Sequence, residues 1–468
     1  MDYKTHPSFP VLAAVMGPEL AEKAIREAEI AKTKANQAET VSSKEARQII
    51  IPHSMNKLDA AKELKRQWDD EEQIINVSRE FPNWHWSDVL VAAKRAAEEY
   101  FGWIRGKSKQ SFFGTRRPQE IDIVVDIKNG QKLTETCFYG SITASIWEDA
   151  TLEVGAGRVF AEVKKRYANE VREFFDLIQK TLDTRSIYRG KAITVTKDES
   201  PWGDVSLHFD IFEMKTSDKI VLNDDIESIV QNFIIDDLGQ EGKRCYLFSG
   251  GYGNGKTETA MRVGKAGLDK QMAYFYCKDA DVFHMLLKNA VNYQPCIVFL
   301  EDVDEIGSGT KRDADMNRIL NTLDGVQTKG NDLTVIFTTN HENKINPALR
   351  RPGRIDLVIN FDNPDKVSVA KIYEAYLKPH GGNHNYEKLA ENTPEAPGAV
   401  VAEIAKRAVK LCKKRGKYTD DLVSAAINSM KHHLKLMSEP VEEEKNGSMT
   451  IQVSGAQMKI EKKSVSSN

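Results

Sequence analysis

The pattern of hydrophobic and polar positions along the chain changes near residue 215. Before that position, charged stretches with helical apolar spacing are followed by segments in which apolar and polar residues alternate. After it, short continuous apolar runs are separated by helical segments. Runs of this second kind are typical of a parallel sheet that is covered on both faces. The pattern therefore predicts an α/β fold, preceded by helical and small α+β N-terminal regions.

The first hundred residues are predicted to be helical. Residues 19–39 and 56–77 are rich in charged residues and alanine and carry thin apolar faces, as solvated helices do. A third helix is predicted after the N-cap signal at Ser87, because apolar residues recur at helical spacing from there to Phe101.

An α+β region is predicted to follow these helices. Apolar and polar residues alternate over 121–138 on both sides of Asn129-Gly130, which favours a hairpin with a type I′ turn. The apolar residues between Phe160 and Leu182 recur on one helix face and predict one long amphipathic helix. Alternating segments at 192–195 and 205–212 are predicted to be the last two strands of this region.

The second part of the chain contains five candidate strands and a helical end. The strands are predicted at residues 246–248, 272–276, 296–300, 333–337 and 357–359. Residues 364–437 are helical in pattern, and those from 439 onward are polar with little to bury. We therefore expect a charged helical region at 1–105, an α+β domain at 106–215, an α/β subdomain at 219–362, a helical lid at 363–437 and a polar tail at 438–468.

A glycine-rich loop follows the first of the five strands. The motif G-x-x-x-x-G-K-T is spelled by Gly250, Gly251, Tyr252, Gly253, Asn254, Gly255, Lys256 and Thr257. Glycines allow backbone N–H groups to turn inward around a phosphate, the lysine reaches the β- and γ-phosphates, and the hydroxyl is a ligand for Mg²⁺. With a strand before it and a helix after it, the motif predicts a nucleotide-phosphate site.

Two later strands end in residues that suit phosphate chemistry. The strand at 296–300 is followed by Glu301 and Asp302, and carboxylates there can position Mg²⁺ and activate a water molecule. The next strand is followed by Asn340, whose amide can orient that water. Further on, Arg351 and Arg354 can neutralise charge that develops on the γ-phosphate. Taken alone, the acids fit a solvated strand end and the arginines a solvated turn.

Together, these residues resemble the AAA family of P-loop ATPases over about residues 219 to 437. The matching elements are Walker A at 250–257, Walker B at 297–302, the family's LDG element at Leu323-Asp324-Gly325, sensor 1 at Asn340, arginine fingers at Arg351 and Arg354, and the sensor-2 region at Pro397-Gly398-Ala399. The resemblance implies an AAA core with a helical lid and ATP and Mg²⁺ as cofactors. It also implies a homo-oligomeric ring, usually a hexamer, in which one protomer's arginines complete its neighbour's site.

The resemblance also assigns roles to single residues. The catalytic residues that it implies are Glu301, Asp302, Asn340, Arg351 and Arg354. The nucleotide-binding residues are Gly250, Gly251, Tyr252, Gly253, Asn254, Gly255, Lys256, Thr257, Glu258, Gly398 and Ala399. The metal ligands are Thr257, Glu301 and Asp302.

This chain departs from the family pattern in two ways. The order Glu301-Asp302 reverses the usual Asp-Glu and is similar to that of the mitochondrial AAA translocase of the Rieske protein. We expect active hydrolysis, with slower or longer-reach water activation by the shorter Asp302. Residues 278–295 lack the aromatic-hydrophobic-Gly pore loop of protein-threading relatives, so threading is not expected. Phe283 and His284 are expected to be a helix-packing and a surface residue.

Composition narrows the classes of partner and compartment. Lys and Arg number 66 against 69 Asp and Glu, for a net charge of −3, so no global field favours nucleic acid or an anionic membrane. The 5 cysteines are scattered singly, which fits neither a disulfide framework nor a zinc site and indicates a cytoplasmic location. No segment suits a signal peptide or a membrane span, so no membrane partner is expected.

A basic, aromatic and acid-free stretch at 100–117 leaves the function open. Its rings can stack on bases while its cations track phosphates, as in a nucleic-acid-associated motor or loader. The alternative is that the rings pack into the N-terminal domain and the cations are solvated. The leading hypothesis is an ATP-hydrolysing ring that remodels a protein client recognised through residues 1–215. A third hypothesis is a slow nucleotide-dependent assembly scaffold.

Overall fold

The structure is a computed structural model, and its chain divides into two compact units. It describes residues 8–37, 57–102, 105–106, 109–111, 114–116, 119–144, 147, 150–155, 157–199, 205–215, 219–305, 319, 321–323, 332–342, 345, 351 and 353–438. The first unit comprises Met1–Ser217, Ser228–Gly250 and Lys256–Asn360, and the second comprises Asp218–Glu227, Gly251–Gly255 and Phe361–Asn468.

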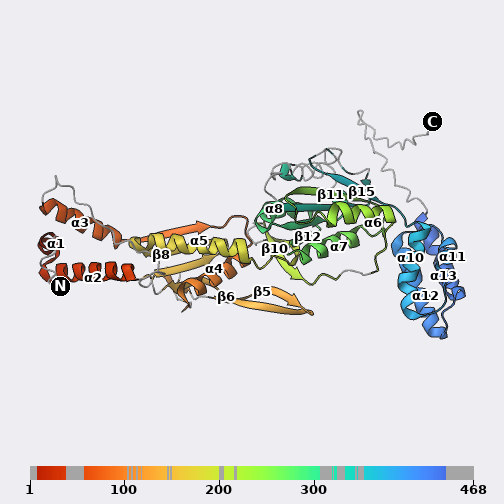
Figure 1. The fold of residues 1–468 in the computed structure, drawn as a ribbon, viewed down its shortest axis with the longest axis horizontal. Helices are drawn as coiled ribbons and strands as arrows, with labels where there is room; N and C mark the ends of the chain where they lie inside the picture. The colour runs from red at the N-terminus through yellow and green to blue at the C-terminus, as the bar shows by residue number, and fades with distance from the viewer. Residues whose placement is uncertain are drawn as a thin grey trace, which may run out of the picture. The chain divides into compact units, whose positions relative to one another are not determined.

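The first unit begins with helices that lead into an antiparallel sheet (Figure 1). The helices are α1 (Phe9–Met16), α2 (Pro18–Gln37) and α3 (Lys57–Glu71). The prediction of a helix that continues to residue 77 is wrong, because β1 (Ile74–Glu80) pairs antiparallel with β8 (Arg158–Lys164). Val77 is buried on the inner face of this strand. Pairing with a distant strand here overrides the local helical spacing.

The antiparallel sheet has the strand order β1-β8-β7-β6-β2, and β5 pairs with β6. Its other strands are β2 (Arg105–Gly106), β5 (Gln119–Lys128), β6 (Gln131–Ala144) and β7 (Ala150–Gly155), and β3 (Lys109–Ser111) pairs separately with β4 (Gly114–Arg116). The predicted type I′ hairpin is confirmed, since Asn129 and Gly130 both have positive φ, at 53° and 75°.

Two helices, α4 (Trp86–Phe101) and α5 (Ala168–Arg185), pack on the buried face of the antiparallel sheet. The predicted amphipathic helix is therefore correct only from residue 168. Phe160 and Val163 belong to β8, in which Val159, Ala161 and Val163 are buried in alternation. A spacing of three residues fits a helix face and a strand with mixed faces equally, so the local pattern did not separate them.

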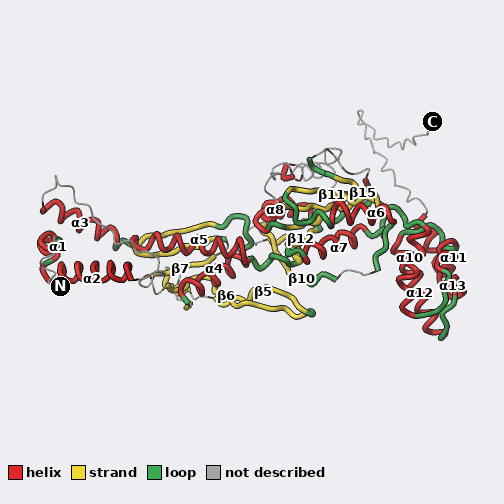
Figure 2. The backbone as a smooth tube through the Cα atoms, in the orientation of Figure 1, coloured by secondary structure: helices red, strands yellow, loops and turns green. Residues whose placement is uncertain are grey.

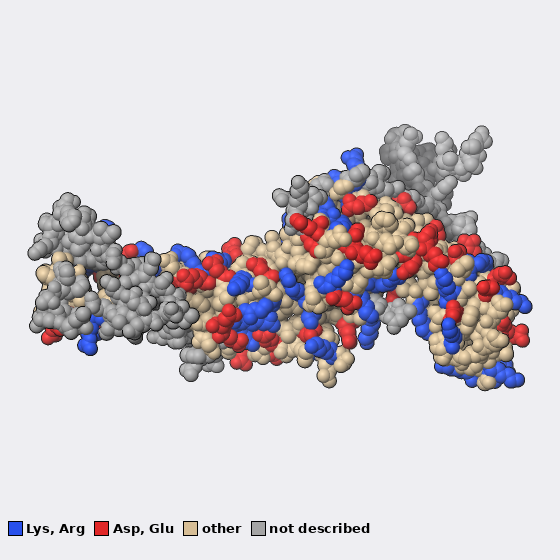
Figure 3. All heavy atoms as spheres, viewed as in Figure 1, with Lys and Arg blue, Asp and Glu red and all other residues tan. Residues whose placement is uncertain are grey.

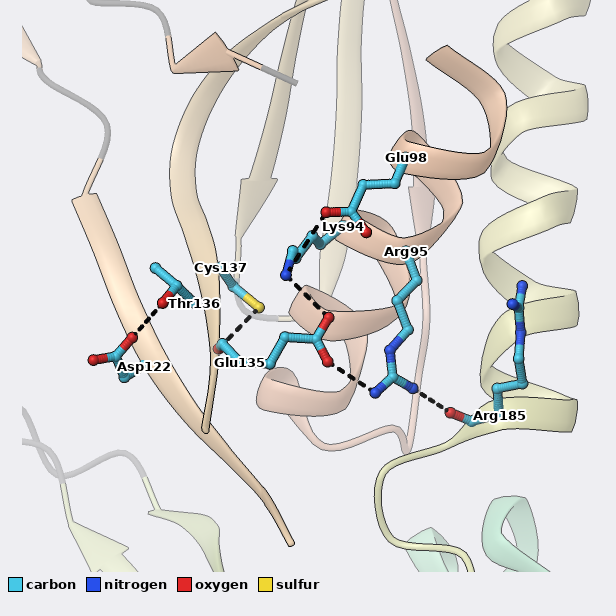
Figure 4. Close-up of polar contacts among 8 residues, drawn as sticks. All are labelled: Lys94, Arg95, Glu98, Asp122, Glu135, Thr136, Cys137 and Arg185. Carbon is cyan, nitrogen blue, oxygen red and sulfur yellow. Dashed lines mark hydrogen bonds and ion pairs between the residues drawn. The ribbon is translucent and has the colours of Figure 1, made fainter. Parts of the chain in front are cut away.

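An ion-pair cluster ties the hairpin to these helices. Glu135 of β6 accepts hydrogen bonds from Lys94 (3.1 Å) and Arg95 (2.9 Å) of α4, and Arg95 also donates to the carbonyl of Arg185 at the end of α5 (2.9 Å; Figure 4). Burial opposes ionisation of Glu135, but the hydrogen bonds from the two cations outweigh it and lower the pKa of this carboxyl. The cluster fixes the hairpin on the helical layer.

The second sheet of this unit is the α/β core and has the order β10-β9-β12-β13-β14-β11-β15. Its strands are β9 (Ala192–Glu199), β10 (Val205–Phe212), β11 (Gly242–Gly250), β12 (Ala273–Cys277), β13 (Cys296–Leu300), β14 (Asp332–Thr339) and β15 (Leu357–Phe361). All five predicted core strands are present. The neighbouring pairs β9–β12, β12–β13 and β13–β14 are parallel. The mixed α/β fold class is confirmed.

The strands β9 and β10 extend this core sheet, which the hydrophobic pattern did not indicate. The register places Tyr274 of β12 opposite Ala192 of β9, and β10 pairs antiparallel with β9 at the edge. The expectation that these two strands complete the N-terminal α+β region is therefore wrong. The physical reason is that main-chain pairing leaves no trace in side-chain alternation.

Helices cover both faces of the core sheet (Figure 2). They are η4 (Gln231–Ile235), α7 (Lys256–Asp269) and α8 (Ala280–Ala290) with η5 (Val291–Tyr293); α6 (Asp224–Val230) precedes η4 along the chain, and η6 (Val303–Glu305) follows β13. On one face, Phe283 of α8 packs against Phe337 with ring centroids 5.4 Å apart, which confirms its expected packing role. On the other face, a Cβ added at Gly264 of α7 would lie 2.4 Å from the ring of Tyr274.

A buried polar network joins α4 to the core sheet. The imidazole of His85, the N-cap residue of α4, stacks on Phe209 of β10 with centroids 4.5 Å apart, and its Nε2 lies 3.1 Å from the carbonyl of Leu207. The backbone N–H of His85 donates to the hydroxyl of Tyr293 (2.7 Å), and the hydroxyl of Tyr188 lies 3.0 Å from Nδ1. Burial lowers the pKa of His85 to about 4, so the ring is neutral at pH 7.

The second unit is a helical domain with its own core. It contains α10 (Lys366–Leu377), η8 (Lys378–His380), α11 (Tyr386–Glu391), α12 (Gly398–Arg415) and α13 (Asp420–Ser438). The predicted helical pattern over 364–437 is confirmed, and the predicted polar tail lies outside the described residues from 439 onward. None of the helices in the described parts of the chain has the length and apolar character needed to cross a bilayer.

Candidate active site

The glycine-rich loop connects the end of β11 to the start of α7. Gly250, Gly253 and Gly255 have φ values of 138°, 79° and 89°, a backbone region that residues with a side chain rarely adopt. Within the helical unit, a Cβ added at Gly253 would lie 3.1 Å from Cβ of Ala399, whose N–H donates to the carbonyl of Gly253 (2.9 Å). Two predicted nucleotide-binding segments, the loop and the start of α12, therefore meet.

Lys256 is the first residue of α7 and is 5% exposed. Its ammonium donates to the carbonyl of Gly250 and to Oδ1 of Asn340, each at 2.7 Å. Burial lowers the pKa of Lys256, while Asp302 and Asp304 act in the opposite direction. The structure thus brings the predicted phosphate-binding lysine and the predicted water-orienting amide into direct contact.

The two predicted acids lie side by side but face different partners. Glu301 accepts a hydrogen bond from the hydroxyl of Thr257 (2.8 Å), and Asp302 accepts one from the side-chain amide of Asn340 (2.9 Å). Asp302 has a φ of 49°, which is uncommon for a residue with a side chain. Its N–H donates to the hydroxyl of Thr338 (2.9 Å), which holds this backbone conformation. Such conformations cost about 1–3 kcal/mol and are concentrated at functional sites.

A third acid, Asp304, was not among the predicted site residues. It is 8% exposed and accepts hydrogen bonds from the hydroxyl of Thr339 (2.7 Å) and the N–H of Asn340 (3.1 Å). It therefore fixes the end of β14 from which the Asn340 amide projects. Its position close behind Glu301 and Asp302 is the feature of the sequence that could have pointed to a role at the site. Only the parallel register of β13 and β14 shows that its carboxylate reaches the end of β14.

Tyr276, at the end of β12, was also missed. Its hydroxyl donates to Oε2 of Glu301, and the ammonium of Lys278 lies 3.5 Å from the same oxygen. Burial and the hydrogen bond to Glu301 both raise the pKa of Tyr276. Tyrosine is common in strands for packing reasons alone, so the sequence offered no signal for this contact.

The remaining predicted residues lie in the glycine loop, in α7 and in the turn before β15. Arg351 is exposed and Arg354 half-buried in a turn before β15, where the N–H of Arg354 donates to the carbonyl of Arg351 (3.1 Å). Glu258 lies in the first turn of α7, and Tyr252 is 60% exposed. Of the predicted LDG element only Leu323 is described; Asp324 and Gly325 lie outside the described residues.

The donors at this site fit Mg²⁺ bound together with a phosphate. Thr257 and Glu301 present hard oxygen atoms, and Mg²⁺ is usually held by one or two carboxylates plus substrate phosphates. In the described ranges, no group of three or more His, Cys, Asp or Glu residues could hold a metal ion without such help. A strand and a helix headed by a buried lysine, joined in sequence by the glycine loop, together with the polar ends of the neighbouring strands, are the elements that the motif predicts for a P-loop type of nucleotide site.

Comparison with known proteins identifies the family of this domain. Residues 246–363 match the family described as "ATPase family associated with various cellular activities (AAA)". This segment is an AAA ATPase domain, which implies ATP hydrolysis, and AAA ATPases bind ATP, usually with Mg²⁺. The family commonly forms rings.

Two kinds of relative share this region. One is the ATP-dependent zinc metalloprotease FtsH 1 of Conexibacter woesei, 30% identical over 203 residues, which are 38% of this chain and 30% of the relative. Another is the 26S proteasome regulatory subunit 4 homolog of Schizosaccharomyces pombe, 30% identical over 194 residues, 37% of this chain and 43% of the relative. The chain thus spans less than half the length of these curated relatives.

Proposed function

We propose that this chain hydrolyses ATP as a member of a homo-oligomeric ring, a hexamer in the usual family arrangement, and uses the energy to remodel a protein client or complex. The observation that carries the proposal is the contact chain from Lys256 through Asn340 to Asp302, next to the Thr257–Glu301 pair. These residues come from separate elements, and the fold brings them to one edge of the core sheet.

The residues divide the chemistry between them. Lys256 releases Asn340 and Gly250 to bind the β- and γ-phosphates, while Thr257 and Glu301 hold Mg²⁺. When bound, Mg²⁺ supplies Lewis-acid stabilisation of charge on the phosphate oxygens. Asp302, held by the Asn340 amide, accepts the proton of the attacking water. Arg351 and Arg354 act on the site of the neighbouring protomer.

The order Glu301-Asp302 affects turnover in this proposal. An aspartate at the base position is one methylene shorter than the usual glutamate, so it approaches the water from farther away. Its left-handed backbone, at a φ of 49°, changes the direction in which the carboxylate leaves the strand. We propose that this geometry allows Asp302 to act as the base although the two acids stand in the order Glu-Asp, which this chain shares with the Rieske translocase group.

Three observations support a protein client in the cytoplasm. One relative named above is called an ATP-dependent zinc metalloprotease and the other a 26S proteasome regulatory subunit homolog, and both names refer to proteins that act on proteins. All five cysteines are free and buried, as expected in a reducing compartment. On the face drawn in Figure 3, cationic and anionic side chains of the described residues are interspersed rather than gathered in one basic area. We propose that residues 1–215 recognise the client.

The nucleic-acid alternative depends on the stretch at 100–117. Phe101 packs on Trp147 and Phe174, with centroids 5.0 and 5.2 Å away, so this ring serves the core rather than a base. Trp103, Phe112 and Phe113 lie outside the described residues. Tyr100 likewise packs against Trp147 and Phe174, with centroids 6.0 and 5.7 Å away. The aromatic contacts of the described residues in this stretch favour packing, and we therefore place the protein client first.

Measurement of Mg²⁺-dependent ATPase activity tests the proposal. We expect turnover by the wild type and its loss in Lys256→Ala, whereas Lys265→Ala, an exposed lysine of the same helix, keeps it. A pull-down with Asp302→Asn in ATP then captures the client, because the variant binds ATP without hydrolysing it. Wild-type turnover equal to that of Lys256→Ala would refute hydrolysis by this chain.

A further inference from the structure

Both carboxylate oxygens of Glu301 are held by other side chains. Oε1 accepts a hydrogen bond from the hydroxyl of Thr257 (2.8 Å), and Oε2 accepts one from the hydroxyl of Tyr276. Thr257 comes from α7 and Tyr276 from β12, so two independent elements hold one side chain. A glutamate held at both oxygens has a single orientation.

The ring of Tyr276 is itself fixed by its neighbours. It stacks on Phe299 of β13 with centroids 5.5 Å apart and an interplanar angle of 29°, and these two residues are opposite each other in the parallel register. The ammonium of Lys278 lies 5.7 Å from the ring centroid and 3.5 Å from Oε2 of Glu301. The N–H of Glu301 also donates to the carbonyl of Cys277, so the two strand ends are joined by main chain.

The longer acid at this position makes such support useful. A glutamate has one more rotatable bond than an aspartate, and ordering it costs more conformational entropy. A metal ligand that is already ordered does not lose that entropy when the metal binds. The hydroxyl of Tyr276 therefore offsets the disadvantage that the order Glu301-Asp302 creates for metal binding.

We propose that Tyr276 is a positioning residue that fixes Glu301 for Mg²⁺. The inference builds on the proposed ATPase function and adds a residue outside the motifs of the family. Tyr276 does not touch nucleotide or water in this proposal. It acts through Glu301, and its effect is confined to the Mg²⁺-dependent part of nucleotide binding.

The test compares Tyr276→Phe with wild type by the binding of a fluorescent ATP analogue, titrated with Mg²⁺ and in EDTA. We expect unchanged affinity in EDTA and about a tenfold higher Mg²⁺ concentration for half-maximal effect, the size expected for one hydrogen bond to a charged group. The control is Tyr274→Phe, on the same strand and face, because its buried hydroxyl has no hydrogen-bond partner among the described residues. This control should behave as wild type.

A double-mutant cycle with Glu301→Asp adds a second readout. The shorter acid does not reach the tyrosine hydroxyl, so the Phe substitution should have no further effect in that background. An equal loss of affinity with and without Mg²⁺, or an unchanged Mg²⁺ requirement in Tyr276→Phe, would overturn the positioning role and leave the ATPase proposal intact. Absence of nucleotide binding by the wild type would instead refute the proposed function.

Discussion

Replacement of His85 by Gln should remove a specific pH dependence from the stability of the first unit. The buried imidazole has a pKa of about 4 against the ordinary 6.5, so the native state binds fewer protons than the unfolded state between these values. Stability is therefore fully present above pH 6.5 and is lost as the pH falls towards 4. At about 1.36 kcal/mol per pKa unit, the whole effect is about 3 kcal/mol, of which about 2 kcal/mol falls between pH 7 and pH 5.

The measurement is urea unfolding of wild type and His85→Gln at pH 7 and pH 5, followed by tryptophan fluorescence. Trp84 and Trp86 flank the substituted position. Burial raises the pKa of Asp88, in the same helix, to about 6, which gives a pH dependence of opposite sign. Asp88 is present in both proteins, so its contribution cancels in the difference between their unfolding free energies.

As the pH falls from 7 to 5, the free energy of unfolding of His85→Gln should rise by about 2 kcal/mol relative to that of wild type. The glutamine amide can replace the hydrogen bond to Leu207 without gaining a charge. His208→Gln, an exposed histidine on the neighbouring strand β10, is the control for loss of an imidazole, and its slope should change less than that of His85→Gln, because His208 acts on His85 only through its charge. Parallel loss of stability in wild type and His85→Gln would show that the buried ring does not control the transition.

Two further substitutions test the packing of the core and the assembly of the ring. Gly264→Ala should lower the free energy of unfolding by about 1–3 kcal/mol despite its better helix propensity, because the new methyl group meets the Tyr274 ring at 2.4 Å. Thermal unfolding measures this, and recovery by Tyr274→Leu would identify the clash as the cause, whereas a Gly264→Ala protein as stable as wild type would contradict it. Arg351→Ala should abolish ATPase activity alone but regain part of it when mixed with Lys256→Ala, since each variant supplies what the neighbouring site lacks. A mixture as inactive as its components would refute the shared site.

Local signals in the sequence predicted the parts of the fold that are determined locally. The glycine loop needs its glycines at positions of positive φ, and the dipeptide Asn129-Gly130 determines a hairpin turn by its own backbone preferences. Uninterrupted apolar runs similarly identified five of the seven strands of the core sheet. Each of these features depends on residues within a few positions of one another.

The errors and omissions depend on contacts between distant residues. The local spacing predicts a helix at β1, because the partner strand β8 lies more than seventy residues away and only pairing explains the burial of Val77. Asp304 and Tyr276 reach the site through the parallel registers of β13 with its two neighbours. A strand register is a property of the folded sheet, so neither residue could be assigned from the chain alone.

The membership of β9 in the core sheet also decides where the chain can be cut. Composition and the helical pattern suggest a boundary near residue 215. However, β9 and β10 precede this position, and β9 pairs with β12 along one edge. A fragment that begins at 219 would leave the N–H and C=O groups on one side of the five-residue apolar strand β12 open to pairing with other molecules. Such a fragment should aggregate, and the shortest soluble ATPase fragment begins before Ala192.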